Sequence, residues 1–205
     1  MTIPISISIR INFIDEFKKI INSFRERHLN PEKINPVLEP MSRCDGLIAF
    51  VSLGPGKSSA KAAIDFHTHG ADNLSVPKLR HIWLLHSPAS KESAKELREY
   101  AEKQNIMCNL LTLDLTNDVH NMARVKERID DIANQALLEG INHKDIAIDI
   151  TGGTVAVSLG FFMASLIYNF KVQIMIPNET DQDGRAIPEK GAKAFAIGLY
   201  TDTRR

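Results

Sequence analysis

The sequence lacks several features that would identify a class of protein directly. Only two of its 205 residues are cysteines, Cys44 and Cys108, and they form no Cys-x-x-Cys pair. Neither a disulfide framework nor a cysteine zinc site is therefore expected, and both thiols are expected to be reduced, as is usual in the cytoplasm. Histidine and acidic residues show no recognised metal-ligand spacing, so we expect neither a metal nor a cofactor.

The sequence also lacks an excess of one charge and any long apolar run. Lys and Arg together number 25, as do Asp and Glu, which argues against a long nucleic acid as partner. The longest apolar candidate, Val155 to Phe170, is interrupted by polar residues and falls short of the ~18 residues of a membrane span. The N-terminus lacks the order of a signal peptide. With 43% hydrophobic residues, we expect a soluble, cytoplasmic, globular protein with no membrane segment in this chain.

The first 45 residues differ in pattern from the rest. Isoleucines alternate from Ile3 to Ile11, which indicates a strand, and apolar residues then recur at helical spacing from Phe13 to Phe24. The proline-containing stretch Asn30 to Pro40 is interpreted as a linker. We therefore predict an extension over 1–45 and a domain over 46–205. The extension could hold a dimer together, dock on a partner or cover a sheet edge.

From Gly46 onwards, short apolar runs alternate with amphipathic segments. This order predicts βαβ units, and runs such as LIAFV and IAIDI are typical of strands buried on both faces. The expected fold is α/β, a doubly wound, mainly parallel Rossmann-like sheet. Ligands of such sheets bind beyond the carboxyl ends of the strands, so the loops after Leu53, His86 and Ile150 are the candidate sites. Expected strands are 47–53, 81–86, 107–115, 146–150, 172–176 and 194–200; expected helices are 59–67, 90–104, 119–139 and 155–168.

The loop after the first of these strands has the composition of a phosphate-binding turn. It runs from Ser52 to Ser59 as SLGPGKSS, with glycines for a close backbone approach, Lys57 as a cation and a helix start behind it. A P-loop would need a glycine where Val51 stands, and a dinucleotide fingerprint would need one at Ser59. A P-loop protein, a Rossmann enzyme and a turn that binds nothing remain alternatives.

The loop after the strand 146–150 carries a stronger signal. Its sequence, Asp149-Ile-Thr-Gly-Gly-Thr154, brings hydroxyls and glycine N–H groups to a helix start, where an anion or a nucleobase edge can be held. Asp149 is interpreted as a brace for the turn rather than as a catalytic group.

Three segments together resemble the CRISPR-associated Rossmann-fold (CARF) family: FVSLGPGKSSAKAAIDF, HIWLLHSPASKESAKEL and IAIDITGGTVAVSLGFF. They cover about Gly46 to Ile176. The resemblance implies a two-fold homodimer that binds a cyclic tetra- or hexa-adenylate, the second messenger of type III CRISPR antiviral systems, across its axis. The ligand-binding residues that it implies are Ser52, Gly54, Lys57, Ser58, His86, Ser87, Thr151, Gly152, Gly153 and Thr154.

One position departs from the family pattern. Many CARF proteins continue the motif as Thr-Gly-Gly-Thr-Lys, and that lysine matters in members that cleave the ring, but here the residue is Val155. The resemblance therefore favours a sensor of cyclic tetra-adenylate over a metal-independent ring nuclease, which stays the alternative; no catalytic residue is assigned. His86 could instead be structural, Trp83 is expected in the core, and 178–193 is either a lid or a solvated loop.

Overall fold

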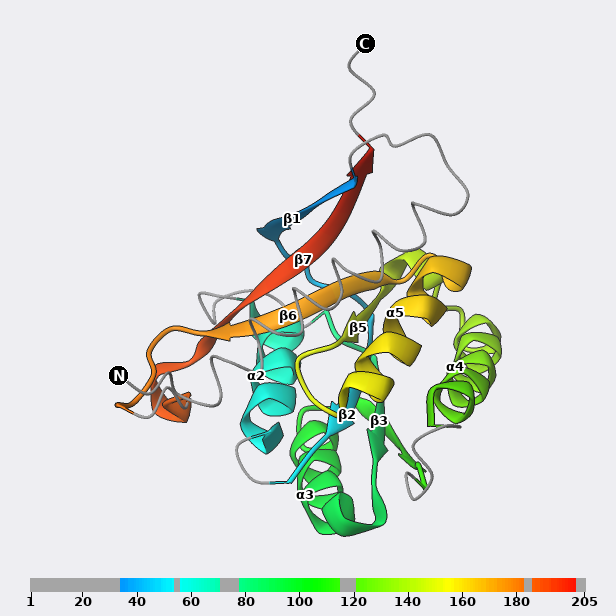
Figure 1. The fold of residues 1–205 in the computed structure, drawn as a ribbon. Coiled ribbons are helices and arrows are strands. Elements are labelled where there is room, and N and C mark those ends of the chain that lie inside the picture. The colour runs from blue at the N-terminus through cyan, green and yellow to red at the C-terminus, as the bar shows by residue number, and fades with distance from the viewer. Residues whose placement is uncertain (1–33, 54–55, 71–77, 115–120, 183–185, 202–205) are drawn as a thin grey trace.

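The structure is a computed structural model that describes residues 34–53, 56–70, 78–114, 121–182 and 186–201 (Figure 1). The expected N-terminal strand and amphipathic helix lie outside these residues. Most elements begin or end within a few residues of their predicted limits. The strands are β1 Ile34–Pro40, β2 Gly46–Val51, β3 His81–His86, β4 Met107–Thr112, β5 Ile146–Asp149, β6 Lys171–Pro177 and β7 Ala192–Thr201. The helices are α2 Gly56–His69, α3 Lys91–Glu102, α4 Asn121–Leu138 and α5 Val155–Tyr168.

The seven strands form one sheet in the order β1-β7-β6-β5-β2-β3-β4. Strands β2 to β6 are parallel, whereas β7 pairs antiparallel with β6, and β1 pairs antiparallel with β7. This confirms the expected α/β, Rossmann-like, mainly parallel sheet. No helix among the described residues is both long and apolar enough to cross a membrane.

Helices cover both faces of the sheet, and the side chains of β2 show how the core is divided. Ile48 and Phe50 belong to the cluster that contains α4 and α5. Leu47, Ala49 and Val51 point the other way, into the cluster that contains α2 and α3. Successive side chains of a strand point to opposite faces, so a strand buried on both faces must be apolar throughout. Trp83 of β3 is fully buried, which confirms its predicted place in the core.

Strand β1 is the main departure from the predicted elements, because it lies within the stretch that we expected to be a linker. It pairs with β7 from Ile34↔Thr201 to Pro40↔Phe195, and β7 pairs with β6 only through Ala192 to Ala196. The far part of β7 and β1 thus form a two-stranded ribbon that projects from the body of the domain (Figure 1).

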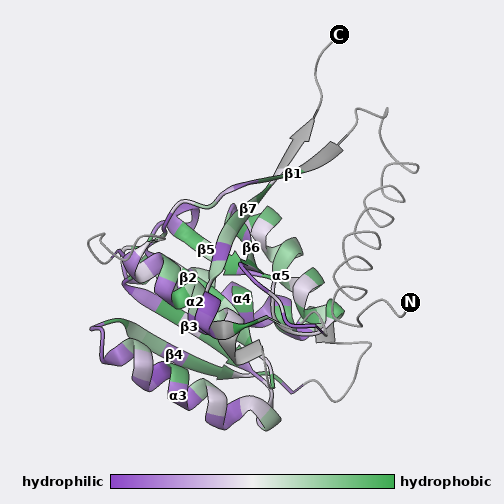
Figure 2. Cartoon of the chain, turned by 90° about the vertical axis from the view of Figure 1, so that its left-hand side faces the viewer, coloured by the Kyte–Doolittle hydropathy of each residue, from purple (hydrophilic) through white to green (hydrophobic). Residues whose placement is uncertain are grey.

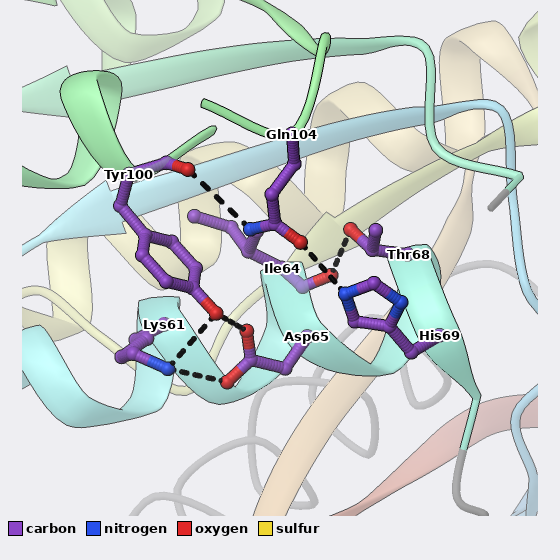
Figure 3. A network of polar contacts seen from close by, with 7 residues as sticks. All are labelled: Lys61, Ile64, Asp65, Thr68, His69, Tyr100 and Gln104. Carbon is purple, nitrogen blue, oxygen red and sulfur yellow. Dashed lines mark hydrogen bonds and ion pairs between the residues drawn. The ribbon is translucent and has the colours of Figure 1, made fainter. Parts of the chain in front are cut away.

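A polar network fixes α2 against α3 on one face of the sheet (Figure 3). The Lys61 ammonium donates to Asp65 at 2.7 Å and to the Tyr100 hydroxyl at 3.2 Å, and that hydroxyl donates to Asp65 at 2.5 Å. Burial and the Asp65 carboxylate raise the pKa of Tyr100. One turn on, His69 bonds Gln104 at 2.7 Å. These contacts set the position of α2, whose N-terminus follows β2.

Two buried histidines lie near the amino ends of the strands. His67 accepts a hydrogen bond on Nδ1 from the Cys44 N–H at 2.9 Å, so its proton sits on Nε2, which donates to Gln173 Oε1 at 2.7 Å. Burial, with a smaller contribution from nearby cations such as Lys171, lowers the pKa of His67 to about 4, although the hydrogen bond to Gln173 opposes this. His81 stacks on Trp83 with ring centroids 4.2 Å apart.

Candidate ligand-binding site at the carboxyl edge of the sheet

The candidate site lies where the chain reverses its direction of travel across the sheet. Strand β2 is hydrogen-bonded to β3 on one side and to β5 on the other. The chain passes from β2 to β3 and β4, but from β5 to β6 in the opposite direction. Parallel neighbours end at the same edge, so the loops after β2 and β5 lie together at this switch point, with the N-termini of α2 and α5 behind them. Such a switch point is the usual ligand site of doubly wound sheets.

Gly152 brings the two loops into contact. A Cβ atom built on this residue would lie 2.7 Å from the Phe50 carbonyl oxygen of β2, which is closer than real Cβ atoms approach backbone. The same position is 3.9 Å from the Ser52 hydroxyl oxygen in the loop after β2. Only glycine allows the second loop to lie so close to the first. The next residue, Gly153, has a φ of +94°, which L side chains rarely adopt.

The loop after β5 is held by its own polar groups. The Thr151 N–H donates to the buried Asp149 carboxylate at 2.7 Å, which is the bracing role predicted for Asp149. The Thr151 hydroxyl accepts a hydrogen bond from the Met175 N–H of β6 at 2.7 Å. Ser158 of α5 donates to the Ile150 carbonyl at 3.3 Å. The loop is therefore tied to β6 and to α5 without any ligand.

Thr154 caps α5 and ends the loop. Its hydroxyl accepts from the Val157 N–H at 3.4 Å, and its backbone is extended. The first N–H groups of a helix have no partner within it and carry the positive end of the helix dipole. Gly153 and Thr154 are exposed, so the exposed part of the motif is next to this helix start.

The loop after β2 contains only four residues, 52–55, between the end of β2 and the start of α2. Val51 is a buried strand residue, as predicted, and no loop long enough to wrap a phosphate in the P-loop manner separates it from Gly56. Ser52 is half-buried beside Gly152. Gly54 lies outside the described residues. Lys57 and Ser58 stand in the first turn of α2, and their side chains also lie outside the description.

His86 and Ser87, at the end of β3, have intramolecular partners. His86 is buried; its Nδ1 donates to the Ser87 carbonyl at 2.9 Å, so its Nε2 accepts from the Thr112 hydroxyl of β4 at 3.3 Å. The Ser87 hydroxyl accepts from the Ser90 N–H at 3.3 Å and caps the short 3-10 turn Pro88–Ser90. Of the ten predicted residues, the structure brings seven to one edge at the level of the backbone, with His86 and Ser87 one strand further from β5 and Gly54 outside the description.

Sequence reasoning did not find Thr112, Met175 and Ser158, which support the predicted residues. Thr112 and Met175 act through contacts with residues 26 and 24 positions away, and Ser158 bonds Ile150 eight residues before it. No local motif marks any of the three. Among the described residues, no group of three or more His, Cys, Asp or Glu side chains could hold a metal ion.

Comparison with known proteins rests on structure. No protein-family model matches the sequence, and no curated protein matches it. A type III CRISPR defence DNA nuclease activated by cyclic oligoadenylate is similar, with a TM-score of 0.50 and 15% identity over 74% of this chain and 21% of the nuclease. Can2 from Sulfobacillus thermosulfidooxidans, in complex with cyclic tetra-adenylate, has a TM-score of 0.47 and 15% identity over 63% of this chain and 31% of Can2.

A third similar structure is protein VC1899 from Vibrio cholerae, with a TM-score of 0.49 and 14% identity over 65% of this chain and 31% of that protein. This chain therefore spans less than a third of the length of each of the three. In fold, the chain is similar to the type III CRISPR defence DNA nuclease over 74% of its length.

Proposed function

We propose that this protein is a sensor of a cyclic oligoadenylate, most simply cyclic tetra-adenylate, that acts as a cytoplasmic homodimer in type III CRISPR antiviral signalling. The observation that carries the proposal is the contact of two glycine-containing loops at the switch point, with two helix N-termini behind them. The CARF-like motifs of the sequence fall on these two loops. The DNA nuclease of similar fold is activated by cyclic oligoadenylate.

The geometry suits a phosphodiester ligand in particular. Helix N-termini bind phosphate through free N–H groups and the helix dipole, so the starts of α2 and α5 would each face a phosphate. Ser52, Gly54, Lys57 and Ser58 would line the ligand on one side, and Thr151, Gly152, Gly153 and Thr154 on the other. A ring with two-fold symmetry would then contact the same loops of a second copy.

His86 and Ser87 would contribute differently from the other predicted residues. The side chains of both are used by partners within the protein, and His86 is buried. We assign them to supporting the edge of the site.

The side chain of Val155 favours a sensing role over a ring-cleaving role. It is exposed at the first position of α5, next to the loop, and it is apolar where the lysine of ring-cleaving CARF proteins would stand. It cannot supply a positive charge to a developing phosphorane. We therefore propose that the bound ring stays intact.

Calorimetric titration with cyclic tetra- and hexa-adenylate, followed by chromatography of the recovered ligand, tests this function. We expect binding of one intact ring per two chains. Recovery of linear adenylates would make the protein a ring nuclease, and Lys57→Ala would then be the variant to examine. Binding of ATP or a dinucleotide but of neither ring would contradict the proposal and return the choice to an ordinary nucleotide-binding Rossmann protein.

A further inference from the structure

Helix α5 presents an apolar surface to solvent that no described element covers. Its fourteen residues include no charged side chain. In Figure 2 most of its visible surface has the hydrophobic colour, whereas α3 is mixed. Three exposed apolar residues lie in its second half: Met163 (44% exposed), Leu166 (62%) and Ile167 (57%). Their spacing of three and four residues places them on one side of the helix, which we call the α5 stripe.

A second apolar surface lies on the outer strands of the sheet, on the same face as α5. Ile197 of β7 packs against the core cluster that contains α4 and α5. Leu38 of β1 pairs directly with Ile197, so its side chain points to this face too, and it is 47% exposed. On the opposite face, α2 packs against β7. Among the described residues, no helix packs comparably on the α5 face of β7 or β1.

The chain that precedes β1 reaches the sheet at the edge where the α5 stripe lies. Helix α5 ends at Tyr168 and β6 begins at Lys171, so the second half of α5 lies toward the amino edge of the parallel strands. Strand β7 pairs with β6 only up to Ala196, and its remaining residues run to this edge and beyond it. Ile34 pairs with the last residue of β7, so residues 1–33 join the described domain beyond the edge at which α5 ends.

The segment before Ile34 has the composition of a helix that covers an apolar surface. Apolar residues recur at helical spacing from Phe13 to Phe24, and charged residues fall between them. A helix of this length extends over about 18 Å, and α5 over about 21 Å. The nine residues 25–33 can span about 30 Å, more than twice the ~13 Å between Ile34 and Leu38 along β1. The linker is therefore long enough to return the helix over the α5 face.

We propose that the segment from Phe13 to Phe24 is a helix that docks on the α5 stripe and on the α5 face of the outer strands. It would cover these strands on one face as α2 does on the other, and it would belong to the folded domain rather than to a separate extension. A tethered segment competes for such a surface at a high effective concentration, which favours it over a separate protein. The inference is independent of the proposed function, because the stripe lies at the end of α5 remote from the Thr-Gly-Gly-Thr loop.

Truncation of single side chains in the full chain tests whether the stripe is covered. Leu166→Ala should raise the equilibrium constant of unfolding, measured by urea titration, by more than about tenfold, as for a buried leucine. The matched control is Leu53→Ala, because Leu53 is 61% exposed and lies in the loop after β2 at the carboxyl edge. The control should change the constant by no more than about twofold. An effect at Leu166 as small as that of the control would overturn the proposal.

A double-mutant cycle identifies the N-terminal segment as the occupant. Phe17→Ala should itself destabilise the chain. Leu166→Ala should then have a much smaller effect in the Phe17→Ala background, because the first substitution has already removed the shared contact. Leu53→Ala should have the same effect with and without Phe17→Ala. Additive effects of Phe17→Ala and Leu166→Ala would contradict the proposed docking.

Cross-linking separates docking within one chain from association between chains. The variant with Ile20→Cys and Met163→Cys, treated with a short bifunctional maleimide, should give an internally linked monomer. Ile20→Cys with Met107→Cys should not, because β4 is the strand at the opposite end of the sheet from β1. The native thiols give little background, since burial raises the pKa of Cys44 to about 11 and that of Cys108 to about 12. Linked dimers in place of linked monomers would show that a second copy covers the stripe and would overturn the proposal.

Discussion

The two edges of the parallel sheet use polar groups in opposite ways. At the carboxyl edge, the exposed residues Gly153 and Thr154 follow a loop that is held by Asp149, Thr151 and the backbone of β6. At the amino edge, imidazoles are buried and bonded to the protein, as with His67 between Cys44 and Gln173. Under the proposed function, Gly153 and Thr154 at the first edge receive the ligand, whereas His67 at the second edge contributes to stability.

Adding a methyl group at Gly152, where the two loops meet, should have the largest effect on ligand affinity and a clear effect on stability. Gly152→Ala places a Cβ 2.7 Å from the Phe50 carbonyl, so the two loops must separate. We expect a loss of about 1–3 kcal/mol in the free energy of unfolding. Affinity for cyclic tetra-adenylate, measured by calorimetry, should fall about 10- to 100-fold, because losing a hydrogen bond to a charged phosphate costs about 1.5–3 kcal/mol.

Gly140, between α4 and β5, provides the matched control at the amino edge. Its φ is +71°, but nothing lies within 4 Å of a Cβ built there. Gly140→Ala should therefore cost about 1 kcal/mol of stability through backbone strain and leave ligand affinity unchanged. Equal loss of affinity in both variants would contradict the division of roles between the edges.

The buried histidines predict how stability responds to acid. The pKa of His67 is about 4 in the folded chain and about 6.5 when the imidazole is exposed in the unfolded chain. Above pH 6.5 the imidazole is neutral in both states, so stability is not reduced by its protonation. Below that pH the unfolded chain takes up a proton that the folded chain does not, and stability falls by up to about 1.4 kcal/mol per pH unit until about pH 4. Burial lowers the pKa of His81 as well, although Glu139 opposes this, and its contribution has the same sign.

Denaturant titrations at several pH values would measure this slope. His67→Asn keeps an acceptor for the Cys44 N–H but cannot titrate, so the slope should become shallower. The variant should also lose about 1–3 kcal/mol at neutral pH, because Gln173 loses its buried donor. An unchanged slope would show that another group controls the acid response.

A change at Thr151 should affect both stability and binding. Thr151→Val removes the hydroxyl that accepts from the Met175 N–H, and leaving that group unpaired should cost about 1–3 kcal/mol. Ligand affinity should fall with it, because the loop loses its tie to β6. Thr151→Ser keeps the hydroxyl and should restore both; failure of the serine to do so would mean that the methyl group is what matters.

The smallest expected effect is at Ser87. Ser87→Ala removes the cap of the turn Pro88–Ser90 and should cost about 0.5–1 kcal/mol in chemical denaturation. Affinity for the ring should change by less than about fivefold, since a loss of about 1 kcal/mol corresponds to about fivefold even if it is wholly transmitted. A large loss of affinity would restore Ser87 as a direct ligand contact.

The parts of the fold that depend on local pattern could be predicted from the sequence. Continuous apolar runs place β2 and β5, and the Thr-Gly-Gly-Thr element places the start of α5. The polar contacts across the sheet could not be predicted, because the bond between His86 and Thr112 depends on the register of β3 and β4. Likewise, the bond between Thr151 and Met175 requires that β6 lies beside β5.

Strand β1 was not predicted, because its prolines made the stretch look like a linker. The same prolines affect how the chain behaves at high concentration. β1 is the outermost strand of the described sheet, and no other described strand pairs with its outer edge. Exposed strand edges promote aggregation. Pro36 and Pro40 carry no N–H, so two of the seven residues of β1 cannot donate to an incoming strand. The prolines that made β1 hard to predict from the sequence therefore reduce edge-to-edge aggregation.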